Sequence, residues 1–131
     1  MEPKNNLIDT NIAIYYFGLQ LTEEATSFIE QLFRNNYHIS VINRIELLGF
    51  DKVSSEQYNA LEAFVNNATI LDLDEAVVVE TIKIRQQYNT KLPDAIIAAS
   101  CIVNDCCLLT NNTKDFEKIN GLKVKTLGVK V

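Results

Sequence analysis

The chain has 131 residues, of which 47% are hydrophobic, and it carries a formal net charge of −5 with a sequence pI of about 4.8. This size fits one domain over residues 1–131, and no apolar run reaches the ~20 residues that a membrane helix needs. The acidic balance argues against binding nucleic acid through a broad basic face, but it allows a nuclease whose acids hold metal ions. The N-terminal residues lack the layout of a signal peptide, so we expect a cytoplasmic protein with no membrane partner.

The N-terminal part alternates short apolar runs with helical patterns. Residues 6–9 (NLID) predict a strand, and residues 10–17 (TNIAIYYF) have helical spacing until a glycine stops it. Residues 22–35 begin with a threonine cap and two acids and place their apolar side chains on one face, which predicts an amphipathic helix. Residues 37–42 (YHISVI) are strand-like, and residues 43–50 (NRIELLGF) return to a short helix.

The C-terminal part continues this alternation. The capping-box sequence SSEQ opens a predicted helix over 54–66, and ATILDL at 68–73 predicts the third strand. Two further helices are expected at 74–88 and 93–104. The remaining expected elements are a fourth strand at 106–110, a short helix at 114–119 and a fifth strand at 122–127. Alternating strands and helices favour parallel pairing, so we predict an α/β fold, a three-layer α/β/α sandwich with a parallel five-stranded sheet.

Four acids fall at comparable places in this scheme. Asp9 ends the first predicted strand, and Glu46 and Asp115 follow the second and the fourth. Ligands bind outside the carboxyl ends of parallel strands. Asp94 opens the helix before the fourth strand, so it reaches the same edge only if that helix begins there. Taken alone, Asp94 after Pro93 is also an ordinary helix start, because the helix dipole favours an acid in the first turn. Four carboxylates without a matching basic cluster would repel one another, and a hard cation such as Mg²⁺ or Mn²⁺ would relieve that repulsion.

Three segments, in this order, resemble the PIN-domain ribonucleases, and among them the toxins of VapBC toxin–antitoxin pairs: LIDTNIAIYY, ISVINRIELLGF and KLPDAIIAASCIVNDCCLLTNNTKDFEKINGLKV. The resemblance covers nearly the whole chain and implies a PIN-like sandwich. It also implies an acidic catalytic pocket with two supporting polar side chains: Asp9, Glu46, Asp94 and Asp115, with Asn11 and Thr110. The chain departs from the family pattern at two places, with Asn112 where many relatives have an acid and Asn43 where Ser or Thr is common.

The same resemblance implies an endoribonuclease that depends on Mg²⁺ or Mn²⁺ and is held inactive, as a toxin, by a cognate antitoxin. The implied metal ligands are Asp9, Asp94 and Asp115. Glu46 would bind metal or orient water. The expected RNA contacts are basic residues close in sequence to three of the acids: Arg44, Lys91 and Lys114. The expected partners are RNA, an antitoxin whose C-terminal arm brings a basic residue into the pocket, and a second copy of the chain in a homodimer.

Other classes of protein share parts of this pattern. An aspartyl phosphatase would need a second acid two residues after the first, and Asn11 occupies that position. A receiver-type signalling domain would need adjacent acids after the first strand, which the sequence DTN does not supply. A catalytically weak or inactive PIN-like domain that binds RNA or protein is the remaining alternative. Convergence of the four acids in space would favour the nuclease over it.

Overall fold

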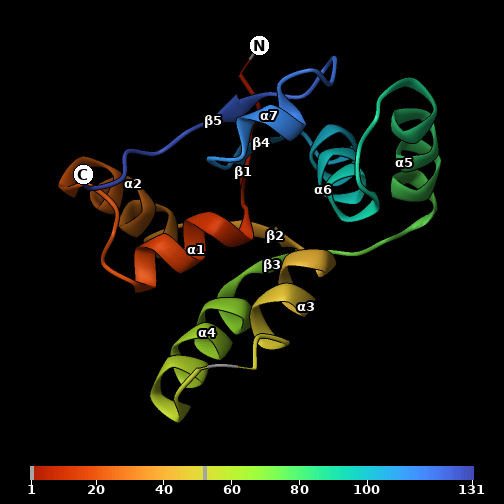
Figure 1. The fold of residues 1–131 in the computed structure, drawn as a ribbon. Coiled ribbons are helices and arrows are strands. Elements are labelled where there is room, and N and C mark those ends of the chain that lie inside the picture. Colours follow the sequence, from red (N-terminus) through yellow and green to blue (C-terminus); the bar gives the residue numbers. More distant parts are fainter. Residues whose placement is uncertain (1, 52) are drawn as a thin grey trace.

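Five parallel strands form one sheet, in the order β3-β2-β1-β4-β5, in the computed structural model, which describes residues 2–51 and 53–131 (Figure 1). The strands are β1 (Asn5–Ile8), β2 (His38–Ser40), β3 (Thr69–Leu71), β4 (Cys106–Leu109) and β5 (Val124–Lys125). Leu7 of β1 lies opposite both His38 of β2 and Leu108 of β4, so the first strand is the central one. The parallel five-stranded sheet confirms the predicted fold class.

Helices cover both faces of this sheet. They are α1 (Thr10–Phe17), α2 (Glu23–Arg34), α3 (Val41–Leu48), α4 (Ser55–Asn67), α5 (Glu75–Gln87), α6 (Leu92–Val103) and α7 (Thr113–Phe116). Because successive strand residues point to opposite faces, Leu7 and Leu108 enter the core formed with α5 and α6, whereas Ile8 and Leu109 enter the core formed with α1, α2 and α4. Figure 1 shows α1 and α2 on one side and α5 and α6 on the other.

The boundary between β2 and α3 differs from the prediction. The expected strand at 37–42 ends at Ser40, and the helix begins at Val41. Ser40 Oγ accepts a hydrogen bond from the N–H of Ile42 (3.0 Å), and Asn43 Oδ1 accepts one from the N–H of Ser40 (2.8 Å). These bonds form a capping box that starts the helix. The cap therefore outweighs the strand preference of the two β-branched residues that follow Ser40.

The last two elements are shorter than predicted. The strand expected at 122–127 is only Val124–Lys125, and the helix expected at 114–119 is a single turn, Thr113–Phe116. After β5 the chain leaves the sheet, because the side chain of Asn111 accepts from the N–H of Leu127 (2.9 Å) and donates to its carbonyl (2.9 Å). The Asn111 side chain thus takes the place of the backbone hydrogen bonds that a longer strand would have made.

Helix α6 decides where Asp94 lies. It precedes β4 by a tight turn in which Asp105 has a φ of 53°, so it runs antiparallel to β4 and begins at the carboxyl edge of the sheet. The helix is buried from Ala95 through Cys101 and packs on α5, which explains the apolar run after Asp94. Among the residues that the structure describes, no helix is both long and apolar enough to cross a membrane.

Candidate active site

Asp9 lies where the connections of the sheet diverge. It directly follows β1 and caps the N-terminus of α1, and its N–H donates to the carbonyl of Leu109 at the end of β4 (3.0 Å). After β1 the chain continues to β2, and after β4 it continues to β5. In the strand order, β2 and β5 lie in opposite directions from the central pair β1 and β4. Such a point is the usual ligand-binding edge of an open parallel sheet. The Asp9 side chain is only 6% exposed there.

Hydrogen-bond donors hold both carboxylate oxygens of Asp9. Oδ1 accepts from the N–H of Thr10 (2.9 Å) and from Asn43 Nδ2 (3.1 Å). Oδ2 accepts from Thr110 Oγ1 (2.7 Å) and from Asn11 Nδ2 (3.3 Å). Burial raises the pKa of Asp9, and these bonds offset part of that rise. Asn11 and Thr110 therefore lie where the family resemblance placed them, and the carboxylate is held in one orientation.

Asp94 faces the other acids. It is half-buried in the first turn of α6. Its pKa is raised to about 6, first by burial and then by the negative charge of three side chains: Asp115, Asp9 and Glu46. Lys91 lowers it in part. An acid that only served the helix dipole would have a lowered pKa. The structure therefore brings all four predicted carboxylates to one edge of the sheet, from four separate elements.

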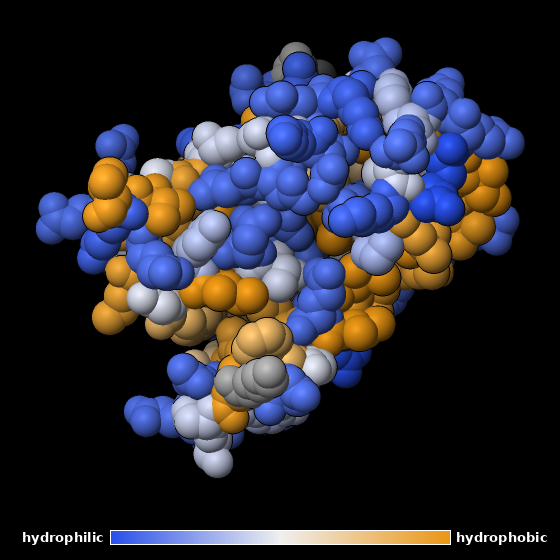
Figure 2. All heavy atoms as spheres, in the orientation of Figure 1, coloured by the Kyte–Doolittle hydropathy of each residue, from blue (hydrophilic) through white to orange (hydrophobic). Residues whose placement is uncertain are grey.

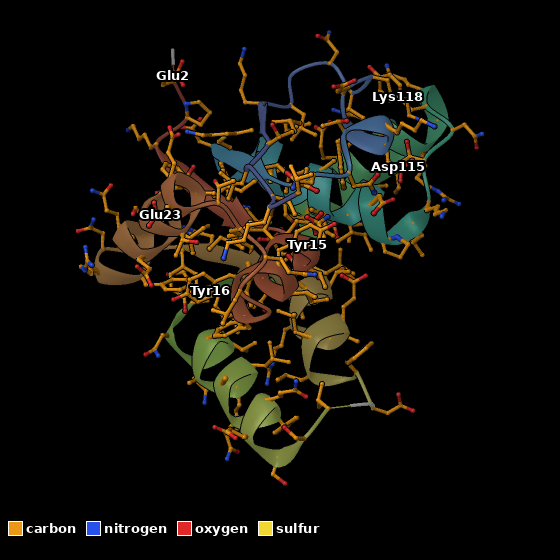
Figure 3. All side chains as sticks on the ribbon, turned by 60° about the vertical axis from the view of Figure 1, so that its left-hand side comes forward. Glu2, Tyr15, Tyr16, Glu23, Asp115 and Lys118 are labelled. Carbon is orange, nitrogen blue, oxygen red and sulfur yellow. The ribbon has the colours of Figure 1, made fainter. Side chains whose placement is uncertain are left out.

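Glu46 and Asp115 each have a polar partner at this edge. Glu46 is exposed on α3, and its Oε1 accepts from Thr10 Oγ1 at 2.6 Å. Asp115 is half-buried on α7, and its Oδ2 accepts from Asn112 Nδ2 at 2.8 Å. Figure 3 shows Asp115 on the α7 side of the molecule and Tyr16 on the opposite side, toward α2. Tyr16 donates to Glu30 Oε2 of α2 at 2.9 Å.

Three polar residues at this edge lie outside the predicted set. Asn43 is 0% exposed and contacts Asp9, although the sequence marked it only as a departure from the family pattern. Its signal was the spacing Ser40-x-x-Asn43, a capping-box pattern that the strand-like residues between them concealed. Thr10 and Asn112 are the other two, and each donates to an acid. Asn112 thus supports Asp115 with its side-chain amide.

The three basic residues expected to contact RNA are all exposed. Lys91 immediately precedes α6 and is close enough to Asp94 to affect its pKa. Arg44 lies on α3 with Glu46, and Lys114 lies on α7 with Asp115. Each basic residue is therefore carried by, or adjoins, the element that supplies one of the acids.

The donor set suits a hard divalent cation, because Mg²⁺ and Mn²⁺ prefer carboxylate oxygens. Within residues 2–51 and 53–131, no three Asp, Glu, His or Cys side chains stand close enough together to enclose an ion by themselves. This is compatible with Mg²⁺, which usually keeps several waters and binds through one or two carboxylates and a substrate phosphate. Fold and site together define an open parallel α/β protein with a cluster of four acids at the switch point of its sheet.

Comparison with known proteins identifies the family. The PIN domain model matches residues 7–122, so the chain belongs to the PIN domain family. It is 29% identical over 127 residues to the tRNA(fMet)-specific endonuclease VapC of Shigella flexneri, covering 91% of this chain and 95% of that protein. It is 29% identical over 131 residues to Ribonuclease VapC1 of Methanocaldococcus jannaschii, covering 94% and 88%. A toxin–antitoxin complex from Klebsiella pneumoniae has a chain of similar structure, with a TM-score of 0.75, 30% identity and coverage of 93% and 97%. The predicted resemblance to VapC-type PIN domains is confirmed.

Proposed function

We propose that this chain, as one domain over residues 1–131, is a divalent-metal-dependent endoribonuclease and the toxin of a toxin–antitoxin pair, acting in the cytoplasm. The observation that carries the proposal is the convergence of four carboxylates from separate elements, close enough together for Asp115, Asp9 and Glu46 to add to the rise in the pKa of Asp94 that burial causes. A fold gains no stability from gathering four like charges, so their convergence points to function. Two curated relatives named as RNA-cleaving VapC enzymes support the substrate class.

Asp9, Asp94 and Asp115 are the proposed ligands of Mg²⁺ or Mn²⁺, one or two of them contacting a cation directly and the rest through its bound water molecules. A cation bound there would lower the pKa of a water molecule and stabilise negative charge on the phosphate. Asp9 offers a fixed carboxylate because four donors hold it, and Asn11, at 3.3 Å, is the donor most easily displaced by a ligand. Asp94 must be ionised to bind a cation, so a cation competes with a proton for a carboxyl whose pKa is raised to about 6 in the chain without metal.

The remaining side chains orient water and RNA. Glu46, held by the Thr10 hydroxyl, can orient an attacking water and accept its proton. Arg44, Lys91 and Lys114 are exposed near the acids and can contact phosphates, which positions RNA without reading its bases. The overall acidity of the chain is thus compatible with an RNA substrate, because positive charge is needed only around the pocket.

An apolar groove beside the acids is the proposed binding site of the antitoxin. The groove measures about 620 Å³, and its lining includes Ile14 and Phe17 of α1, Leu47 of α3, Phe50 after it, and Glu46. Figure 2 shows hydrophobic atoms exposed where the arm formed by α3 and α4 meets the rest of the molecule. An amphipathic antitoxin helix would fill this groove, and an Arg or Lys on its C-terminal arm would pair with the acids and oppose cation binding.

A homodimer is the second proposed assembly. Exposed apolar side chains occur on α3, on α5 and at the start of α6: Ile45, Val79, Ile82 and Leu92. Figure 2 shows hydrophobic atoms at the right-hand edge of the molecule, over α5. A second copy would cover this apolar surface. Sedimentation velocity should therefore show a dimer for the wild type and a monomer for Ile82→Glu.

Cleavage of bulk tRNA and rRNA, with Mg²⁺ or Mn²⁺ and with EDTA, tests the nuclease. We expect cleavage with cation, none with EDTA, and none by Asp94→Asn. Expression of the chain alone should arrest growth of its host, and Asp9→Asn should reverse the arrest. Asp9→Asn also disturbs four hydrogen bonds. Its effect on growth should therefore be compared with the effect of Asp94→Asn. RNA binding without cleavage would favour the inactive alternative, and cleavage without growth arrest would favour housekeeping RNA processing.

A further inference from the structure

The side-chain amide of Asn43 has a settled orientation. It is fully buried, and its Oδ1 accepts from the N–H of Ser40 at 2.8 Å. The oxygen and nitrogen of a carboxamide are distinguished by their partners, so this backbone donor places Nδ2 on the side of the acids. Nδ2 lies 3.1 Å from Asp9 Oδ1 and 3.1 Å from Thr10 Oγ1. Both protons on Nδ2 are therefore used in hydrogen bonds, one to Asp9 and one to Thr10.

Thr10 extends this chain of hydrogen bonds to a second acid. Its hydroxyl accepts from Asn43, so its single proton is available for Glu46 Oε1, 2.6 Å away. A hydroxyl that bonds a carboxylate at this distance makes a short, charge-assisted bond. Glu46 is exposed, and a long exposed side chain without such a partner would sample several rotamers. The donor and the acceptor of each bond are thus fixed: Asn43 donates to Thr10, and Thr10 donates to Glu46.

We propose that Asn43 and Thr10 are positioning residues that hold the Glu46 carboxylate at a set place relative to Asp9. The proposal rests on the proposed ribonuclease function, in which Glu46 orients water. The four residues span two elements, because Asp9 and Thr10 begin α1 whereas Asn43 and Glu46 belong to α3. Since Asn43 is buried and Thr10 is turned toward Glu46, their loss should affect turnover more than RNA affinity.

Thr10→Val tests the link to Glu46. Valine resembles threonine in shape and keeps the N–H that Asp9 accepts, but it lacks the hydroxyl. We expect kcat for RNA cleavage to fall about tenfold or more while KM changes less than about twofold, because the lost contact orients a group instead of binding RNA. Thr10→Ser keeps the hydroxyl and should restore most of kcat. In a Glu46→Gln background, Thr10→Val should cause little further loss.

The Asn43 side-chain amide gives a readout that does not depend on cleavage. In ¹⁵N-edited NMR spectra of the wild type, both of its protons should exchange slowly with solvent. Thr10→Val should shift one of these protons and speed its exchange, and Glu46→Gln should shift the same proton through Thr10. Glu24→Gln, which neutralises an exposed acid on α2, should leave both resonances unchanged. Melting temperatures of all variants report whether the fold is kept.

Three results would overturn the positioning role. They are a wild-type kcat in a folded Thr10→Val variant, an equal loss from Thr10→Val in both backgrounds, and an Asn43 amide that Thr10→Val leaves unchanged. A wild-type chain that cleaves no RNA would instead overturn the proposed function. The Asn43 resonances would still decide whether Thr10 connects Asn43 to Glu46.

Discussion

Replacing Asp94 by asparagine should make the protein inactive and more stable at the same time. The pKa of Asp94 is raised from 3.8 to about 6 in the folded chain, so the folded chain binds this proton more tightly than the unfolded chain does. The stabilisation from the proton is then fully present below about pH 4 and is lost as pH rises through about 6. At neutral pH the ionised Asp94 destabilises the folded chain. An uncharged asparagine of the same size removes this destabilisation.

The magnitude follows from the shift. A rise of about two pKa units corresponds to about 3 kcal/mol, and the partial exposure of Asp94 reduces this to about 1–2 kcal/mol because solvent screens the charges. Loss of a favourable acid from the first turn of α6 offsets about 0.3–1 kcal/mol. A net gain of about 1 kcal/mol would raise the melting temperature by about 3–5 °C in a chain of 131 residues.

Urea and thermal denaturation of both proteins between about pH 4 and 8 measure this gain, which should be small at the acidic end and grow toward neutral pH. Glu75→Gln is a matched control, because Glu75 is an exposed acid in the first turn of α5. It should be slightly destabilising, and cleavage should be unchanged. An Asp94→Asn variant that is destabilised like Glu75→Gln at every pH, or that cleaves RNA at the wild-type rate, would reduce Asp94 to an ordinary helix start.

Three further predictions concern the cation, pH and RNA. Millimolar Mn²⁺ should raise the melting temperature of the wild type, because a ligand bound only to the folded state stabilises it; an equal rise in Asp9→Asn/Asp94→Asn would count against the site. At a cation concentration below saturation, cleavage should decline below about pH 6, where Asp94 takes up a proton, and more Mn²⁺ should move the decline to lower pH; a decline that does not respond to cation contradicts its role as an ionised ligand. Changing Arg44, Lys91 and Lys114 together to glutamine should weaken RNA binding and lower the salt slope by about two; an unchanged slope in filter-binding titrations removes them from the RNA path.

The sheet and its helices could be predicted because each element leaves a local pattern. The position of Asp94 followed from topology, since a helix that leads into a parallel strand begins at the carboxyl edge of the sheet. Asp9 needed only its place directly after β1, and Asp115 only its place on the connection that follows β4. These placements depend on strand direction, which the alternation of strands and helices indicates.

Asn43 could not be predicted in the same way. Its importance depends on which atoms stand across from it after folding, namely an oxygen of Asp9 and the Thr10 hydroxyl, which are distant in sequence. The end of β2 was missed for a different, local reason: Val41 and Ile42 favour a strand, while the cap formed by Ser40 and Asn43 favours a helix. Side-chain pairing across elements decides the contacts of Asn43 with Asp9 and Thr10, and a single sequence does not reveal such pairing.

Glu46 belongs to two surfaces at once. It is part of the lining of the apolar groove, and its Oε1 accepts the Thr10 hydroxyl at the acidic edge. A cationic group delivered along the groove would compete with Thr10 for that carboxylate. Silencing the enzyme would then require no backbone movement, only an exchange of partners by one side chain. The affinity of an inhibitor for Glu46 and the strength of the Thr10–Glu46 contact would then be coupled. Strengthening the Thr10 contact should weaken inhibitor binding by the same factor.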